Sequence, residues 1–478
     1  MKTSTKNIIF GLVAGGLLLF AGQAGPRAAT FILILEIAAL IGVCIYLFRA
    51  AKNLQGDAQV SSIYSRFTER LLAQPVLTWV LLGFAIPFFF YFVQPVFLNS
   101  EQHIQDYNSF VPGTKSIGLD LQRLTELSRA WFEEGKSPYP IQFYPPLTYV
   151  FFAPLALLKY PANYAVQTLL TLLCFVLLTF SLPLRMRGRE HLPLILLFFL
   201  TSLLSYGFLF ELERGQNNVM TMLLCLSAIY IFHYRYELRT LAYVLFSLAV
   251  QFKLYPLIFI VMLVKDWRDW KGNLRRFAAL GLLNFTLLFA MGPHIFWEFI
   301  SNLPKQAANP KWYLITNHSI SSFVHELTRG EWIQLPPQFK FLAHYDDYLR
   351  LMFFGLFALC FGLALLRAYR QNERGLNSYL LLVCTLGALL IPVSVDYKLP
   401  LLAAPMALFF IDTEMIAGSK SKRLLGIVLI FVSALAYAMV LFPYKIKAPI
   451  LSSAFIPLIV ILICASALNW MREKNYSA

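Results

Sequence analysis

Apolar residues recur along this chain in segments of roughly twenty, separated by short polar or charged stretches. A helix needs about 20 apolar residues to cross the hydrocarbon core of a bilayer, and inside lipid it satisfies its own backbone hydrogen bonds. The pattern therefore predicts an all-α protein, a polytopic bundle of about 12–14 transmembrane helices. The expected spans are residues 8–23, 30–49, 76–98, 163–184, 191–210, 217–234, 239–251, 255–266, 275–298, 347–367, 377–394, 399–414, 423–443 and 449–469.

The two short spans at 239–251 and 255–266 allow two interpretations. They fit two helices that meet near Lys253, and they also fit one long helix kinked near Pro256. When the N-terminus is placed in the cytoplasm, basic residues cluster at the inner ends of successive spans, as the positive-inside rule expects. This agreement continues to the C-terminus only if the chain crosses twice between 239 and 266. We therefore expect two crossings there, with both termini cytoplasmic.

A polar, aromatic-rich stretch from about Asn99 to Tyr144 interrupts the apolar pattern after the third span. Within it, residues 120–134 carry a stripe of large apolar side chains at helical spacing, with the charged residues largely off that stripe. A later apolar stretch, 146–159, contains Pro154 and must lie outside if the arginines at 185–189 are cytoplasmic. We expect two juxtamembrane helices on the outer surface, the second broken at Pro154. The stripe consists of Leu121, Leu124, Leu127 and Trp131, and the charged residues off it are Arg123, Glu126 and Arg129.

The domain organisation predicted from this pattern has two parts. Residues 1–70 form two N-terminal transmembrane helices and an interfacial linker, and residues 71–478 form the main membrane domain. The main domain carries two large outer loops, 99–160 and 299–346. The first apolar run imitates a signal peptide, but a second span follows almost at once, so we expect an uncleaved first helix.

Composition supports membrane embedding. Only 14% of the residues are charged and 58% are hydrophobic, whereas a soluble domain has about 25% charged residues. The net charge of +15 would suit nucleic acid, but the basic residues lie at helix ends, so we expect no nucleic-acid partner. The six cysteines fall within apolar runs and show no CxxC or Cys/His spacing, which predicts neither a disulfide framework nor a metal site.

Five polar clusters lie on the outer side in this topology. Ionisable groups near membrane depth are costly and usually mark a functional cavity. A carboxylate together with lysine and arginine suits a reaction in which a hydroxyl nucleophile displaces a phosphate leaving group. The carboxylate removes the hydroxyl proton, and the cations stabilise the departing phosphate. The clusters are Asp120 with Arg123, Glu211 to Asn218 with Arg214 and Gln216, Lys253, Asn317 to Ser322, and Asp396-Tyr397-Lys398.

Each cluster also has a structural interpretation. Asp120 can be a helix N-terminal charge that the macrodipole favours, and Gly215 to Asn218 can be an ordinary turn. Lys253 can extend to the lipid headgroups. Asp396 and Lys398 can neutralise each other in a tight hairpin. The residues assigned to solvated loop are His103, Asp106, His318 and His325.

Short motifs follow one another in a recognisable order: Asp120, Gly135 to Tyr139, Tyr144 to Leu147, Gly215-Gln216 with Asn218, Lys253 to Pro256, Asn317 with Ser319 and Ile320, and Pro392 to Tyr397. This series resembles glycosyltransferase family 87 of the GT-C superfamily, the polyprenyl-phosphate-mannose-dependent membrane mannosyltransferases. The chain departs from the family pattern in three ways. The two helices before residue 70 are additional, Asn217 replaces a usually apolar residue, and Asp396 and Lys398 stand where relatives often have His nearby.

The resemblance implies an inverting transferase of the plasma membrane with an extracytoplasmic active site and a GT-C-like fold. Asp120 would be the general base, and Lys253, helped by Arg123 or Arg214, would bind the donor phosphate. The implied partners are membrane lipid, a polyprenyl-phosphate sugar donor, usually mannose in this family, and a lipid-linked or surface glycan acceptor. No cofactor or metal is expected. The residues expected to contact sugar or acceptor are Tyr139, Phe143, Tyr144, Gln216, Asn218, Asn317, Asp396, Tyr397 and Lys398.

Two other functions fit part of the pattern. A flippase or transporter of lipid-linked sugars also has basic groups in a lipid-facing cavity, but such proteins often contain inverted repeats and none is visible in this sequence. A surface-polysaccharide polymerase or ligase also combines many spans with a large outer loop. We expect the loop of such an enzyme to be richer in Arg and His.

Overall fold

The computed structural model describes residues 117–139, 144–307, 316–329, 341–413 and 454–474, except 204, 343, 373–374 and 392, together with a few residues between 425 and 433. Apart from one isolated β-bridge, the regular secondary structure of these residues is entirely helical, which confirms the all-α prediction. The parts of the prediction that lie outside the described residues are the spans 8–23, 30–49 and 76–98, most of 423–443, and His103, Asp106 and Phe143.

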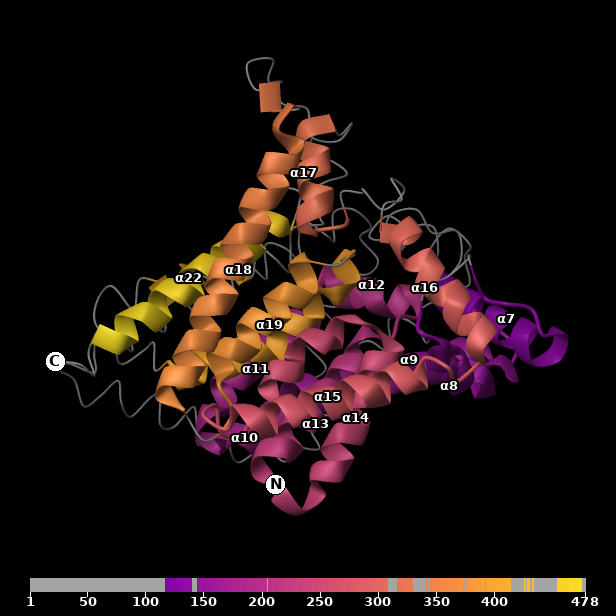
Figure 1. Cartoon of the computed structure of the whole chain (residues 1–478), viewed down its shortest axis with the longest axis horizontal. Helices are drawn as coiled ribbons and strands as arrows, with labels where there is room; N and C mark the ends of the chain where they lie inside the picture. Colours follow the sequence, from indigo (N-terminus) through magenta and orange to yellow (C-terminus); the bar gives the residue numbers. More distant parts are fainter. Residues whose placement is uncertain are drawn as a thin grey trace, which may run out of the picture.

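The helices form a bundle in which α7, α8 and α16 lie together at one edge (Figure 1). In chain order they are α7 (Leu119–Glu134), α8 (Pro146–Ala156), α9 (Ala162–Val176), η2 (Leu177–Ser181), α10 (Leu182–Arg187), η3 (Arg189–His191), α11 (Leu192–Leu203), α12 (Tyr206–Arg214), α13 (Asn218–Tyr234), η4 (Tyr236–Leu238), α14 (Arg239–Phe252), η5 (Tyr255–Met262), α15 (Trp270–Leu287), α16 (Pro293–Ala307), α17 (Ile320–Arg329), α18 (Asp346–Gln371), α19 (Ser378–Leu390), η8 (Asp396–Leu402), α20 (Ala403–Asp412) and α22 (Phe455–Lys474).

Among the described residues, two continuous helices are long and apolar enough to cross a membrane. One is Ala162–Arg187, which joins α9, η2 and α10, and the other is α18. A third span is added if α11 and α12, bent by 54° at their junction, form one crossing. These helices coincide with the predicted spans 163–184, 347–367 and 191–210. The molecule is therefore an all-α membrane protein, as expected.

The predicted span at 275–298 is wrong, because the chain forms two helices there. α15 ends at Leu287 and α16 begins at Pro293, with Gly292 between them at a φ of +97°. Glycine adopts this backbone without steric cost, and proline favours the first turn of a helix. Hydropathy stays high across the break, so the apolar pattern alone did not reveal it.

The chain reverses direction at Lys253. This residue follows α14 in an extended conformation, with φ −152° and ψ 145°. Its ammonium contacts Gln216, just before α13, whereas Met262, at the end of η5, bonds His233 near the other end of α13. The chain thus runs along α14 toward Gln216 and returns through η5 toward the other end of α13. This geometry agrees with the two-segment interpretation of 239–266 and contradicts a single kinked helix.

The α7–α8–α16 group has its own apolar core. Leu121 and Leu124 of the predicted stripe are buried in it, while Arg123, Glu126 and Arg129 are exposed, which confirms the amphipathic helix. The expected break at Pro154 is wrong, because α8 continues two residues past it. That these helices lie at the membrane interface stays a prediction. The other buried members of the core include Tyr139, Tyr149, Phe152, Ile295 and Phe299.

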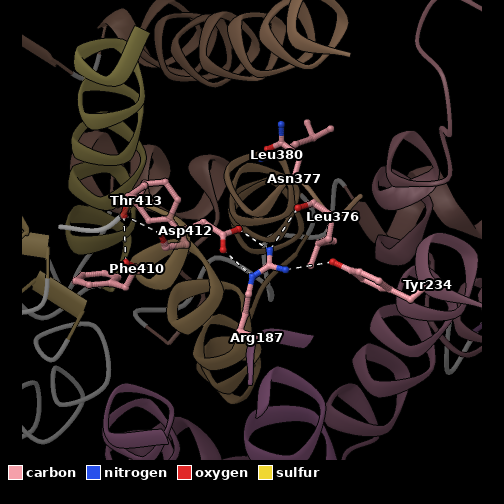
Figure 2. Close-up of polar contacts among 9 residues, drawn as sticks. Arg187, Tyr234, Leu376, Asn377, Leu380, Phe410, Asp412 and Thr413 are labelled. Atoms are coloured by element: carbon pink, nitrogen blue, oxygen red, sulfur yellow. Dashed lines mark hydrogen bonds and ion pairs between the residues drawn. The ribbon is translucent and has the colours of Figure 1, made fainter. Parts of the chain in front are cut away.

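An arginine joins four segments at the end of the bundle where α13 terminates (Figure 2). Arg187, the last residue of α10, donates from Nε and Nη2 to the two carboxylate oxygens of Asp412, at 2.6 and 2.5 Å. Its Nη1 donates to the Tyr234 hydroxyl at 3.1 Å, and Nη2 also reaches the Leu376 carbonyl at 3.5 Å. A guanidinium can satisfy several acceptors at once in this way. We call Arg187, Tyr234, Leu376 and Asp412 the arginine clamp.

Candidate active site

Two glycines allow the start of α7 to approach the turn after α12. Gly118 caps α7 in the left-handed conformation, and its N–H donates to the Glu213 carbonyl at 2.6 Å. Gly215 ends α12 at a φ of +65°, and a Cβ there would lie 2.8 Å from the Leu121 Cβ. A side chain at Gly215 would separate the two segments, and one at Gly118 would clash with the Tyr164 ring on α9, 2.7 Å from its Cβ. The close approach brings Asp120, in the first turn of α7, beside Gln216.

The Gln216 carboxamide bridges Asp120 and Lys253. Its Nε2 donates to Asp120 Oδ2 at 2.5 Å, and its Oε1 accepts from Lys253 Nζ at 2.7 Å. Gln216 is itself fixed, because its backbone carbonyl accepts from Gln167 Nε2 at 3.1 Å. Its side chain is nearly fully buried, whereas the side chain of Asp120 is 20% exposed. Three clusters from distant parts of the sequence therefore meet around one amide.

Lys253 is surrounded by aromatic rings as well as by the amide. Its ammonium lies 5.0 Å from the centre of the Tyr144 ring and 5.7 Å from that of Tyr397. Aromatic faces attract cations at such distances. Burial lowers the pKa of Lys253 to about 8, and the nearby Glu211 and Asp120 carboxylates oppose part of that shift. The structure thus places an ammonium, two tyrosines and a partly exposed carboxylate within one cluster.

Arg214 rather than Arg123 is the arginine beside Asp120. Arg214 Nη1 lies 3.8 Å from Asp120 Oδ1, and its guanidinium also faces the Phe210 ring at 5.3 Å. Arg123 is on the exposed side of α7. Of the two arginines that the sequence offered as helpers, the structure brings one into the cluster.

Glu211 lies beside the cluster and accepts hydrogen bonds from the start of α13. It was not among the predicted site residues. It is fully buried, and its carboxylate accepts from the Val219 N–H at 3.0 Å and from Asn218 Nδ2 at 2.7 Å. A carboxylate at this position also suits the helix dipole at the start of α13. Asn218 is therefore adjacent to the cluster but held by Glu211. The sequence signal was present, since Glu211 lies in the same polar cluster.

Tyr139 and Tyr144 have different positions. The Tyr139 hydroxyl donates to the Tyr144 carbonyl at 2.6 Å, and its ring packs on Tyr149 and Phe299. The Tyr144 hydroxyl reaches Gln216 Oε1 at 3.4 Å. Tyr139 thus fixes the backbone of Tyr144, and Tyr144 contacts the cluster directly.

The remaining predicted residues form a junction between two loops. The Asn317 side chain accepts from the backbone N–H of Ser319 and of Ser394, at 3.1 and 3.0 Å. Lys398 Nζ donates to the Val393 carbonyl at 2.8 Å and to Ser394 Oγ at 3.2 Å. Asn317 and Lys398 thus make contacts within the protein at this junction.

At this junction the structure contradicts one of the structural alternatives and one expectation. Asp396 contacts His318, at 2.8 Å between Oδ1 and Nδ1, rather than pairing with Lys398. His318 was assigned to solvated loop, yet it is fully buried. In the sequence, His318 lies in a polar loop, and nothing in that loop indicates Asp396 as its partner. Within the Asp396-Tyr397-Lys398 triplet, Tyr397 is the residue whose ring faces Lys253.

The cluster offers an acid–base group and an anion-binding group, and the described residues offer no metal site. No group of three His, Cys, Asp or Glu side chains gathers within the part of the chain that the structure describes. The chemistry available is proton acceptance by a carboxylate and electrostatic stabilisation of an anion by Lys253 and Arg214.

A protein-family model, glycosyltransferase family 87, matches residues 143–392, just over half of the chain. The matched residues include Gln216, Lys253 and Asn317, whereas Asp120 and Asp396 lie outside them. The chain has no match among curated proteins or solved structures.

Proposed function

Because the chain belongs to glycosyltransferase family 87 and is a glycosyltransferase, we propose that it transfers a hexose from a polyprenyl-phosphate sugar to a lipid-linked or surface glycan acceptor. The proposed sugar is mannose, and the proposed stereochemistry is inversion. The observation that carries this proposal is the Gln216 amide that contacts Asp120 at one end and Lys253 at the other. Such a reaction needs a base for the acceptor and a cation for the leaving group. One of each is held here by a single side chain.

In the proposed step, the acceptor hydroxyl oxygen attacks the anomeric carbon of the donor sugar while the bond from that carbon to the phosphate oxygen breaks. The hydroxyl proton passes to Asp120, and the bonding electrons leave with polyprenyl phosphate. Lys253 and Arg214 stabilise the negative charge on the phosphate. Attack from the face opposite the leaving group inverts the anomeric configuration.

Neighbouring aromatic groups orient the sugar in this proposal. Tyr144 and Tyr397 stack on the sugar or on the first isoprene units. Gln216 and Asn218, which were expected to bind sugar hydroxyls, are buried and hydrogen-bonded to Asp120, Lys253 and Glu211, so they hold these groups in place. Asn317 serves the same site by fixing the loop that carries Tyr397. The substrates and these side chains together account for every proton and electron pair in the step.

We propose that the site faces the extracytoplasmic side of the plasma membrane, with both chain termini in the cytoplasm. α13 begins beside Gln216 and ends at Tyr234, about 24 Å away at 1.5 Å per residue. Arg187, Arg235 and Arg239 lie around that far end. Basic residues favour the cytoplasmic side, and this supports an extracytoplasmic position for the opposite end, which carries the cluster.

The decisive experiment replaces Asp120 with Asn in the purified, reconstituted protein. Asn keeps an acceptor for Gln216 Nε2 but cannot take the hydroxyl proton. We expect turnover of a polyprenyl-phosphate mannose to fall by about 10²–10⁴-fold, with unchanged affinity for polyprenyl phosphate. Glu133→Gln is the matched control, because Glu133 lies on the same helix with its side chain 64% exposed, and it should keep full activity.

Three results would contradict the proposal. Turnover by Asp120→Asn within threefold of the parent protein would remove Asp120 as the base. A parent protein that moves lipid-linked sugar between leaflets, yet consumes no polyprenyl-phosphate hexose, would support the transporter alternative instead. Polymerisation of whole glycan blocks without hexose transfer would support the ligase alternative.

A further inference from the structure

Two loops that are far apart in sequence are joined beside the proposed active site. The Asp396 N–H donates to the Thr316 carbonyl at 2.8 Å, and the His318 N–H donates to the Ser394 carbonyl at 2.9 Å. These bonds surround the isolated bridge between Asn317 and Val395. The backbone of the second outer loop is thereby fixed to the segment that precedes η8.

The side chains of His318 and Asp396 close this junction. His318 Nδ1 and Asp396 Oδ1 are 2.8 Å apart, and both residues are 1% exposed or less. Burial, and next the Lys398 ammonium, lowers the pKa of His318 to about 3, while burial raises the pKa of Asp396. Both directions favour a neutral pair that shares one hydrogen bond. His318 Nε2, by contrast, has no hydrogen-bond partner among the described residues.

The junction leads directly into the cluster. Tyr397 follows Asp396, and its ring lies 5.7 Å from Lys253 Nζ and packs edge-on against Phe210 at 5.4 Å. On the other side of the chain, the Asp396 carbonyl oxygen lies so close to Gly207 that a Cβ there would be 2.7 Å away. The backbone at Asp396 is therefore confined between α12 and the loop at 316–318. Its position determines where the Tyr397 ring stands relative to Lys253.

We propose that His318 is a positioning residue for the transfer reaction: through its Nδ1 contact with Asp396 it holds Tyr397 beside Lys253, where the donor phosphate binds. This inference rests on the proposed function for the identity of the ligand. His318 touches neither substrate, and its effect passes through Asp396.

The two ring nitrogens make the proposal testable with a matched pair of variants. The amide of Asn occupies the place of His Nδ1, and it can donate to or accept from the Asp396 carboxyl group. The amide of Gln occupies the place of Nε2 and leaves Asp396 without this contact. A positioning role through Nδ1 therefore predicts that His318→Asn retains function and that His318→Gln loses it.

The readouts are affinity for a fluorescent polyprenyl phosphate, the KM for donor and for acceptor, and the thermal unfolding midpoint. We expect His318→Gln to weaken polyprenyl phosphate binding and to raise the donor KM by about tenfold, with the acceptor KM within twofold of the parent. His318→Asn should stay within threefold of the parent in all three constants. Adding Asp396→Ala to His318→Gln should cause no further loss, because both changes remove the same contact.

Several outcomes would overturn the proposal. One is loss of donor affinity in His318→Asn with retention in His318→Gln, which would assign the role to Nε2. Another is equal loss in both variants at normal unfolding midpoints, which would show that a hydrogen bond at the Nδ1 position does not carry the effect. A third is parent-like donor binding in His318→Gln. If His318→Gln does not fold, Asp396→Ala alone tests the same contact, and normal donor affinity in that variant would reject it. Binding is measured without turnover, so absence of transfer by the parent protein would contradict the proposed function and leave this test valid.

Discussion

At the scale of single residues, the charge of Lys253 depends on its surroundings. Burial lowers its pKa to about 8, so the ammonium is lost as the pH rises through that value. A polyprenyl-phosphate sugar is a phosphodiester whose single charge does not change between pH 7 and 10. We therefore expect donor affinity to be constant below about pH 7, to fall by up to roughly tenfold per pH unit above the pKa of Lys253 in the free protein, and to level off above its higher pKa in the donor complex. Equilibrium binding of a short-chain donor between pH 7 and 10 measures this.

Lys253→Arg is the matched variant for the pH experiment. A guanidinium keeps its charge throughout this range, so its donor affinity should not vary between pH 7 and 10, even if it is weaker overall. A decline of the same size in both proteins would show that another group titrates. In that case Lys253 would not be the residue that binds the phosphate.

The sequence indicated some site residues better than others. Asp120, Gln216 and Lys253 lie in short polar motifs between apolar segments, and polar groups in such places are rarely incidental. The bridging amide could not be anticipated, because it depends on the close approach of Gly118 and Gly215. His318 escaped for the same reason: its partner lies 78 residues away, and nothing local distinguishes a buried loop histidine from a solvated one.

At the scale of elements, the position of α7 depends on Gly215. An alanine there would be strained at φ +65°, and its Cβ would lie 2.8 Å from the Leu121 Cβ. We expect Gly215→Ala to destabilise the protein by about 2–5 kcal/mol, from backbone strain plus overpacking. Asp120 would shift relative to Gln216, and a 1 Å displacement can cost about 10²-fold in rate. Thermal unfolding and kcat measured on one preparation test both effects.

Gly135 provides the control for this element. It ends α7 at φ +66°, almost the same backbone conformation, but an added Cβ would meet nothing within 4 Å. Gly135→Ala should therefore show the strain alone, about 1–2 kcal/mol, with kcat unchanged. Equal losses of kcat in the two variants would mean that close packing at Gly215 does not position Asp120.

Element prediction succeeded where periodicity is clear. The stripe that contains Leu121 and Leu124 predicted α7 almost to the residue, because one buried face of an amphipathic helix leaves a direct trace in sequence. The break between α15 and α16 left none, since apolar residues continue on both sides of Gly292. The reversal at Lys253 was visible as two alternatives. Basic residues at the far ends of the spans, rather than local propensity, favoured the correct one.

At the scale of the whole molecule, the amino-acid composition predicted the class of protein but not how its helices pack. A charged fraction of 14% cannot cover a soluble surface of this size, so a membrane bundle followed directly. How short helices such as α12, η5 and η8 assemble depends on contacts between residues 100 or more positions apart. The arginine clamp is an example: Arg187 appeared in the sequence only as a cytoplasmic charge, yet it bonds Asp412 on α20.

The clamp and the proposed active site lie at opposite ends of α13, which predicts that stability and catalysis can be separated. Arg187→Met leaves the carboxylate of Asp412, 22% exposed, without its partner. We expect a loss of about 1–3 kcal/mol of stability, below the range for fully buried pairs because water still reaches both groups. The values of kcat and KM should not change. Thermal unfolding in detergent and steady-state kinetics at a temperature well below the midpoint measure the two quantities.

Two variants determine whether the ion pair itself is responsible. Arg189→Met removes the same charge from the same arginine-rich segment at an exposed position, so it should change stability by less than about 0.5 kcal/mol. Arg187→Met combined with Asp412→Leu removes both charges, and replacement of an ion pair by apolar groups should recover most of the loss. A double variant as unstable as the single one would show that Tyr234 and Leu376, not Asp412, carry the contribution of Arg187. A fall in kcat in the single variant at full folding would instead mean that the two ends of α13 are coupled, and the separation argued from its length would be wrong.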